Sequence, residues 1–311
     1  MTAQAQTVSR RRAWVMAARP QTFPVAAAPV AVGVGLALHE GVFAPLPAFA
    51  ALLGAVLITV GTNLANDYYD AVQGADTEDR EGFTRVTASG LIEPPAVKRA
   101  MWLTFGVAIL LGSYLVWVGG VPILVVGLLS VVSGVAYTGG PYPLGYNGLG
   151  DPFVFVFFGL VAVAGTAYVQ ATSFVAGVPV TPPPGTLPLD AVVAGVAPGA
   201  MATNVLVVNN VRDRDEDRET GKRTLAVRFG LGAARAEYVA MLAAAYLVPV
   251  YFALSGYGLV ALLPLLSLPV AALVARPVLT ETSGAALNPA LERTGKLLAL
   301  FALLFGVGLA L

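Results

Sequence analysis

Long apolar stretches, each about long enough to cross a bilayer, constrain this chain more than any other feature. A helix needs about 20 mostly apolar residues to span a membrane, and we count nine such stretches in the 311-residue sequence. They cover residues 22–39, 46–69, 97–118, 121–138, 152–171, 188–210, 233–254, 257–275 and 294–311. Only 12% of the residues are charged, against about 25% in soluble domains, so lipid must solvate much of the chain. The sequence therefore predicts an all-α, polytopic membrane protein.

The basic residues predict how this bundle is oriented. All 18 Lys and Arg residues fall in the N-terminal tail, in the loops that follow the second, sixth and eighth spans, or at the span ends that border these loops. With nine spans these segments share one side of the membrane, and basic residues mark the cytoplasmic side. We therefore expect a multi-pass protein of the cytoplasmic membrane, with the 1–20 tail and the 71–96 and 211–232 loops in the cytoplasm. Arg19 is interpreted as an anchor on that side.

The second and sixth spans end alike, each in Asn and Asp residues that run into a charged loop. Because these spans lie four apart, we expect two four-helix units plus one extra helix, within a single domain over residues 1–311. The chain has no cysteine, and its one histidine is His39. This composition excludes metal–thiolate and multi-histidine sites. The bilayer is the expected environment, and nucleic acid is not an expected partner.

Two polar clusters stand at the ends of these spans. On a helix, residues spaced i, i+3 or i+4, and i+7 share one face, so each cluster forms a one-sided stripe of oxygen ligands. The members are Asn63, Asn66, Asp67 and Asp70 in the first cluster, and Asn209, Asn210, Asp213 and Asp217 in the second.

Carboxylate and amide oxygens are the ligands that Mg²⁺ prefers, often together with substrate phosphates. Two facing stripes are suited to hold Mg²⁺ around a diphosphate, with Arg212, Lys222 and Arg223 as candidates to pair with phosphate oxygens. A diphosphate at the end of an apolar bundle indicates a substrate with a polar head and a lipid tail. Spacing alone also permits an ion or proton pathway, or structural polar packing.

The segments Asn63-x-x-Asn-Asp-x-x-Asp70 and Asn210-x-Arg-Asp-x-x-x-Asp217 resemble the two signature motifs of the UbiA superfamily of intramembrane prenyltransferases. The likeness extends over nearly the whole chain. Stretches within residues 18–24, 63–90, 137–151 and 209–230 are most similar to members that prenylate 1,4-dihydroxy-2-naphthoate in menaquinone biosynthesis. The 141–151 segment lacks the basic residue that some superfamily members carry there.

The resemblance implies a Mg²⁺-dependent transfer of a polyprenyl group from a prenyl diphosphate to 1,4-dihydroxy-2-naphthoate, with decarboxylation to a demethylmenaquinol. The alternatives are another acceptor (4-hydroxybenzoate, homogentisate or a glycerol-linked lipid) and an ion-coupled membrane transporter. The implied catalytic residues are Asp67, Asp70, Asp213 and Asp217; Asn63 and Asn66 are further metal ligands, and Asn209 and Asn210 are further diphosphate contacts.

Four tyrosines and one aspartate are candidates for binding the aromatic acceptor. Interfacial tyrosines also anchor membrane proteins, and an aspartate followed by proline is typical of a helix start. Both interpretations therefore stay open for each residue. The candidates are Tyr68, Tyr137, Tyr142, Tyr146 and Asp151.

Overall fold

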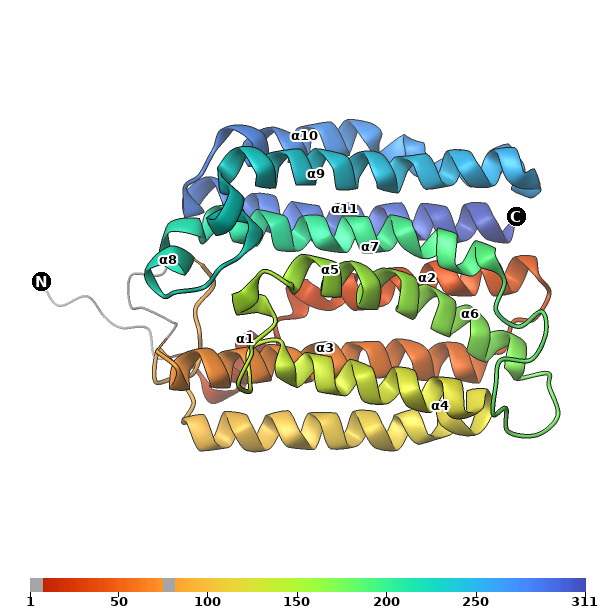
Figure 1. Cartoon of the computed structure of the whole chain (residues 1–311), viewed down its shortest axis with the longest axis horizontal. Coiled ribbons are helices and arrows are strands. Elements are labelled where there is room, and N and C mark those ends of the chain that lie inside the picture. Colours follow the sequence, from red (N-terminus) through yellow and green to blue (C-terminus); the bar gives the residue numbers. More distant parts are fainter. Residues whose placement is uncertain (1–7, 75–81) are drawn as a thin grey trace, which may run out of the picture.

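The apolar stretches of the sequence form helices that lie side by side along one direction (Figure 1). The computed structural model describes residues 8–74 and 82–311, and no β-strand occurs among them. A helix pairs its backbone N–H and C=O groups within itself, which a segment surrounded by lipid requires. The predicted all-α class is therefore confirmed.

Eight helical stretches among the described residues are long and apolar enough to cross a membrane. Short 3-10 segments at Pro20–Thr22, Gly145–Asn147 and Leu259–Ser267, and π-helical segments at Val156–Val161 and Ala253–Tyr257, extend or join the α-helices. The α-helices are α1 (Arg10–Ala18), α2 (Phe23–His39), α3 (Pro45–Val72), α4 (Pro94–Ala136), α5 (Gly150–Phe155), α6 (Ala162–Thr172), α7 (Leu189–Arg212), α8 (Arg214–Glu219), α9 (Leu225–Phe252), α10 (Leu268–Thr280) and α11 (Gly284–Ala310).

A break in α4 accounts for the ninth predicted span. This helix has 43 residues, about 65 Å of length and roughly twice the hydrocarbon thickness of a bilayer. At Gly120 the backbone leaves the helical region with φ 67°, and the chain turns back on itself (Figure 1). A Cβ atom there would lie 1.7 Å from the carbonyl oxygen of Pro179, so only glycine fits. The two halves correspond to the predicted spans 97–118 and 121–138.

Two segments expected to be a tail and a loop contain helices. Within the expected tail, Arg10–Ala18 form α1. The 211–232 loop contains α8 and the first residues of α9, which breaks at Gly230. The 71–96 segment does connect α3 to α4, and its residues 75–81 lie outside the described residues. The assignment to one domain and the grouping into two four-helix units plus one helix stay predictions.

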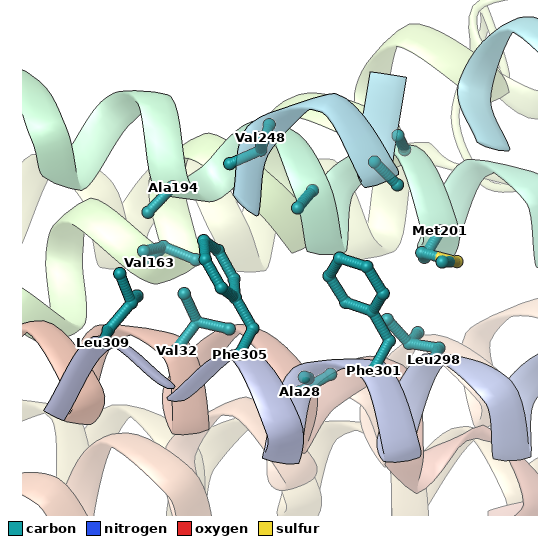
Figure 2. Packing of buried hydrophobic residues seen from close by; sticks show 14 of the residues in the cluster. Ala28, Val32, Val163, Ala194, Met201, Val248, Leu298, Phe301, Phe305 and Leu309 are labelled. Atoms are coloured by element: carbon teal, nitrogen blue, oxygen red, sulfur yellow. The ribbon is translucent and has the colours of Figure 1, made fainter. Parts of the chain in front are cut away.

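The largest hydrophobic core lies between α2, α6, α7, α9 and α11. Phe301 and Phe305 of α11 point into it, near Val32 of α2 (Figure 2). The helices α2 and α11 approach so closely that a Cβ on Gly35 would lie 2.3 Å from the carbonyl oxygen of Gly306. Small residues at such crossings allow the close packing that associates helices in lipid. This core fixes the position of α7, which carries the second polar cluster.

A smaller cluster packs α1 against α3 and α4. It contains Ala13 and Ala17 of α1, Leu64 of α3, Met101 of α4, and Val86 from the α3–α4 connection. The α1 helix, this connection and α8 all lie at the same end of the bundle (Figure 1). We call it the charged end, because both polar clusters of the sequence are found there.

Candidate functional site

A cavity of about 680 Å³ opens between the helices and reaches both polar clusters. Along most of its length the wall is apolar, with Ile58 from α3, Ile123 from α4 and Phe157 from the π-helical segment. At the charged end the wall becomes polar. Of the described residues, three cationic and three carboxylate side chains line this polar end: Arg19, Arg85, Lys222, Asp70, Asp213 and Asp217.

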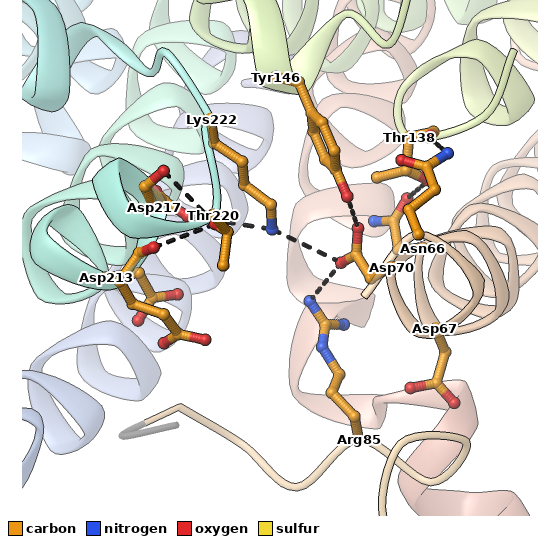
Figure 3. Close-up of polar contacts among 12 residues, drawn as sticks. Asn66, Asp67, Asp70, Arg85, Thr138, Tyr146, Asp213, Asp217, Thr220 and Lys222 are labelled. Atoms are coloured by element: carbon orange, nitrogen blue, oxygen red, sulfur yellow. Dashed lines mark hydrogen bonds and ion pairs between the residues drawn. The ribbon is translucent and has the colours of Figure 1, made fainter. Parts of the chain in front are cut away.

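Two residues of the first cluster, Asn66 and Asp70, line the cavity one helical turn apart on α3. The hydroxyl of Thr138 donates a hydrogen bond of 2.9 Å to Asn66 Oδ1. Asp70 accepts from the hydroxyl of Tyr146 and, at 3.1 Å, from Arg85 Nη2. Figure 3 shows Tyr146 and Arg85 converging on the Asp70 carboxylate, which makes this carboxylate the centre of the polar end.

The other two residues, Asn63 and Asp67, hold neighbouring segments of the chain. The amide of Asn63, which also borders the cavity, donates to the carbonyl of Ala18 at 3.1 Å and to Thr22 Oγ1 at 2.9 Å. The Asp67 carboxylate accepts two hydrogen bonds from Thr87, and the residue is not among those that line the cavity. Asp67 points away from the Asp70 group (Figure 3). The structure therefore does not bring Asp67 together with the other predicted ligands.

The second cluster lies where α7 ends and α8 begins. Asp213 is the residue between the two helices, and Asp217 lies one turn into α8; both are buried and line the cavity. Asn209 and Asn210, predicted as diphosphate contacts, line it as well. The structure thus places all four members of this cluster at the cavity.

Arg212 was predicted to pair with phosphate, but its guanidinium group is buried beside the cavity wall. It donates to Asp213 Oδ2 at 2.8 Å, to Asn209 Oδ1 at 2.7 Å and to Asn288 Oδ1 at 2.9 Å. A guanidinium group forms such planar, multiple contacts better than an ammonium group does. Arg212 therefore orients Asp213 from behind, and its side chain is not among those that line the cavity.

Lys222 connects the two clusters. Its Nζ atom lies 3.9 Å from Asp70 Oδ2 and 3.9 Å from Asp217 Oδ1, and 4.9 Å from the ring centre of Tyr146. Arg223 is exposed and its side chain does not line the cavity, although its backbone N–H donates to the carbonyl of Tyr146 at 2.7 Å. Of the two basic neighbours predicted to meet phosphate, only Lys222 reaches the cavity.

Sequence analysis missed two cations of the site. Arg85 reaches Asp70 from the α3–α4 connection, and Arg19 borders the cavity from the junction of α1 and α2. Arg19 is the one described non-glycine residue with positive φ, 52°, a conformation typical of turns and functional sites. Both were counted only among the basic residues that orient the protein, although each lies within a stretch, 18–24 or 63–90, that resembles the family.

The candidate acceptor residues divide into two groups. Tyr137 and Tyr146 line the cavity. Tyr68 packs against the hydrophobic cluster of α1, α3 and α4, with its ring centre 5.4 Å from Lys98 Nζ. Tyr142 is 58% exposed, and neither residue borders the cavity. The last candidate, the buried Asp151, lies in the first turn of α5 behind the cavity wall.

The Tyr137 hydroxyl is set up to remain a donor. Burial raises the pKa of Tyr137 above the usual range for tyrosine, and the carboxylates of Asp151, Asp217 and Asp70 raise it further. Asp151 Oδ1 in turn accepts from the Asn210 amide at 3.3 Å. Tyr137 therefore keeps its hydroxyl proton at physiological pH, and its side chain lines the cavity.

The oxygen atoms at the polar end fit Mg²⁺ only if a substrate supplies further ligands. Within the described residues, no three carboxylate or imidazole side chains are close enough to form a metal site by themselves. Mg²⁺ usually keeps several waters and binds through one or two carboxylates plus substrate phosphates. Asp70 on one wall and Asp213 and Asp217 on the other provide such a partial ligand set.

Comparison with known proteins identifies relatives of this chain. Residues 26–297 match the UbiA prenyltransferase family. The 1,4-dihydroxy-2-naphthoate octaprenyltransferase of Escherichia coli (strain K12) is 39% identical over 313 residues, covering 98% of this chain and 97% of that protein. The apo structure of a UbiA homolog from Aeropyrum pernix K1 matches with a TM-score of 0.67 and 17% identity, covering 92% of this chain and 96% of that chain.

A second solved structure, a UbiA homolog from Archaeoglobus fulgidus bound to DMAPP and Mg²⁺, has a TM-score of 0.59 and 15% identity. It covers 94% of this chain and 99% of that chain. At these identities the two structures establish the shared fold alone.

Proposed function

Because this chain belongs to the UbiA prenyltransferase family, we propose that it transfers a polyprenyl group from a prenyl diphosphate to 1,4-dihydroxy-2-naphthoate, releasing CO₂ and giving a demethylmenaquinol. One observation carries the proposal: a single cavity has a long apolar wall and, at one end, the Asp70 carboxylate facing those of Asp213 and Asp217, with three cations between and beside them. A prenyl diphosphate has the same division into hydrocarbon and charge. The relative from Escherichia coli is named for this acceptor.

The polar end is suited to bind and stabilise the diphosphate. Lys222, Arg85 and Arg19 place positive charge where the leaving group would carry its negative charge, and such preorganised charge lowers the barrier to its departure. Asp70, Asp213 and Asp217, with Asn66, would hold Mg²⁺. When bound, Mg²⁺ would neutralise further charge on the departing diphosphate. Cleavage of the allylic C–O bond leaves its electron pair on the diphosphate and a carbocation on the prenyl group.

The apolar wall is suited to protect this cation from water. Phe157, Phe158 and Val161 line the cavity beyond the polar end and offer no nucleophile. Exclusion of water prevents hydrolysis of reactive intermediates, so the acceptor carbon becomes the available electron source. The same wall accommodates the hydrocarbon chain of the donor.

Tyr137 and Tyr146 are the proposed acceptor contacts. Both side chains line the cavity, and the Tyr146 hydroxyl donates to Asp70 at its polar end, near where the ring carbon must meet the prenyl cation. The ring carbon that bears the carboxylate forms the new C–C bond. Its bond to the carboxylate then breaks, and the electron pair returns to the ring as CO₂ leaves. Asp151 supports this region indirectly, through Asn210.

The protein is a multi-pass membrane protein, and we place its charged end in the cytoplasm. The basic residues of the sequence are concentrated on that side, as the orientation rule for membrane proteins requires. A water-soluble diphosphate head and acceptor would then enter from the cytoplasm, while the prenyl chain stays in the apolar part of the bundle.

Direct assay tests the proposed reaction. Purified protein in liposomes is incubated with octaprenyl diphosphate, 1,4-dihydroxy-2-naphthoate and Mg²⁺, and the prenylated, decarboxylated product is sought by mass spectrometry. We expect product, and its loss when EDTA removes the metal, because few protein ligands hold Mg²⁺ without the substrate. Product with a different aromatic acceptor alone would overturn the acceptor assignment. If folded protein forms no product with any acceptor or any donor chain length, the alternative of an ion-coupled membrane transporter would be favoured.

The length of the apolar cavity should limit the length of the prenyl donor. Gly165 lines the cavity, and a Cβ there would meet no atom within 4 Å. We expect Gly165→Phe to lower kcat/KM for an octaprenyl donor by about tenfold more than for a geranyl donor, because the ring fills space that the longer chain needs. The matched control is Gly106→Phe in α4, which also has free space but does not line the cavity. Equal losses for both donors would contradict the prediction.

A further inference from the structure

Three of the four Asn and Asp residues of α3 line the cavity, and Asp67 does not. Asn66 and Asp70, one turn apart, line the cavity, whereas Asp67 faces the α3–α4 connection. We propose that Asp67 is a positioning residue that fixes the 82–93 segment and thereby holds Arg85 at the polar end of the cavity, instead of binding metal. This inference rests on the proposed function, because the role of Arg85 is to meet the diphosphate.

The contacts between Asp67 and Thr87 carry the proposal. Asp67 is 1% exposed, and its Oδ2 atom accepts from Thr87 Oγ1 at 3.0 Å and from the Thr87 backbone N–H at 3.3 Å. Thr87 is buried as well. Two hydrogen bonds from one residue to a buried carboxylate fix both the side chain and the backbone of that residue. Hydrogen bonds to charged groups are also the stronger kind.

The segment around Thr87 is folded so that this anchor controls Arg85. The carbonyl of Val86 accepts the backbone N–H groups of Leu91 at 2.9 Å and Ile92 at 3.1 Å, which closes a tight turn. Val86 itself is buried against α1, α3 and α4. Arg85 immediately precedes this turn and reaches Asp70 at 3.1 Å. Because only one residue separates Arg85 from Thr87, the anchor on Asp67 limits where the Arg85 guanidinium group can lie.

The other carboxylate oxygen of Asp67 faces the second cation that sequence analysis missed. Arg19 Nη2 lies 4.0 Å from Asp67 Oδ1. The turn that carries Arg19 is held by Asn63, one helical turn before Asp67, through the carbonyl of Ala18 and the hydroxyl of Thr22. Asn63 and Asp67 thus form a row on α3 that positions the segments on which Arg19 and Arg85 reside.

A role as metal ligand would require Asp67 to abandon these contacts. Asp67 does not line the cavity, so its carboxylate would have to turn around the helix toward Asp70, and its Oδ2 atom would then lose both Thr87 hydrogen bonds. A buried donor left without its acceptor is unfavourable. The observed arrangement instead gives the neighbouring aspartates separate tasks: Asp70 meets the substrate charges, and Asp67 organises the cations.

A spin label tests the anchor without relying on catalysis. The chain has no cysteine, so Ala88→Cys, at an exposed position next to Thr87, accepts one label on the 82–93 segment. We expect Asp67→Asn and Thr87→Val each to increase label motion in the electron paramagnetic resonance spectrum. Thr87→Ser keeps the hydroxyl and should restore the parent spectrum. The control is Asp215→Asn, whose side chain is 82% exposed on α8. Unchanged label motion in both Asp67→Asn and Thr87→Val overturns the proposal.

Binding of geranylgeranyl diphosphate with Mg²⁺, measured by calorimetry, supplies the second readout. Loss of the anchor should raise Kd about tenfold in Asp67→Asn and in Thr87→Val, with no further increase in the double variant. A raised Kd in Asp67→Asn but not in Thr87→Val, together with a spin-label spectrum unchanged from the parent, would identify Asp67 as a metal ligand and overturn the proposal. If the parent protein binds no prenyl diphosphate, the proposed function fails, whereas the spectra still decide whether Asp67 anchors the segment.

Discussion

Asp70→Asn is expected to lower kcat by about 10²–10³-fold, the range seen when one preorganised electrostatic contact is removed from an active site. The substitution keeps the shape of the side chain but removes the charge that Lys222, Arg85 and Tyr146 share. The two cations then lose a common counter-charge, and Mg²⁺ loses an oxygen ligand. Steady-state turnover of 1,4-dihydroxy-2-naphthoate at saturating donor measures the effect, and thermal unfolding in detergent checks the fold.

Asp215→Asn is the matched control for Asp70→Asn. Asp215 belongs to the same sequence cluster as Asp213 and Asp217, but its exposed carboxylate pairs with Arg214 outside the cavity. Exposed ion pairs contribute little to stability, so this variant should retain the parent turnover. Equal losses in the two variants, or normal turnover in Asp70→Asn, would remove Asp70 from the centre of the site.

Lys222→Met should lower kcat/KM for the prenyl diphosphate by about 10²-fold, because one positive charge is lost from the position that bridges the two carboxylate sets. Met preserves most of the apolar length of the side chain, so packing against the Tyr146 ring is retained. Both KM and kcat should change, because the ammonium group faces the diphosphate in the bound and in the departing state. Steady-state kinetics over a range of donor concentrations separate the change in KM from the change in kcat.

The neighbouring residue provides the control for Lys222→Met. Arg223→Met removes a positive charge one residue away, on a side chain that is exposed and outside the cavity. The structure therefore predicts a small effect, whereas the sequence assigned both residues to phosphate binding. A larger loss in Arg223→Met than in Lys222→Met would contradict the arrangement described above.

Much of the architecture could be predicted because lipid imposes simple rules on a sequence. Apolar stretches of sufficient length had to be helices, and the gap between the predicted spans 97–118 and 121–138 coincides with the break of α4 at Gly120. The α8 helix was assigned to a loop because all six residues of Arg214–Glu219 are charged and show no apolar periodicity. Its helical state depends on the surrounding structure, which buries Asp217 at the cavity.

The candidate site was predictable only in its helical parts. Periodicity placed Asn66, Asp67 and Asp70 near one side of α3, but i+3 and i+4 neighbours differ by about 100° around the axis. That difference decides which aspartate meets the cavity, and it depends on the rotation of α3 within the bundle. Arg19 and Arg85 come from non-helical segments, where no period relates position in the sequence to position in space. Their roles emerge only from the contacts with Asp67 and Asp70.

The reversal of α4 at Gly120 bears on how the chain enters the membrane during synthesis. Residues 94–119 and 121–136 are joined without a loop, and no charged residue occurs between Arg99 and Asp151. The tip that must cross the bilayer is therefore small and uncharged, and the two halves can enter together as one hairpin. Pro179, which closes on this tip, is synthesised later. The α4 hairpin is thus complete in the bilayer before the segment that seals its far end has emerged from the ribosome.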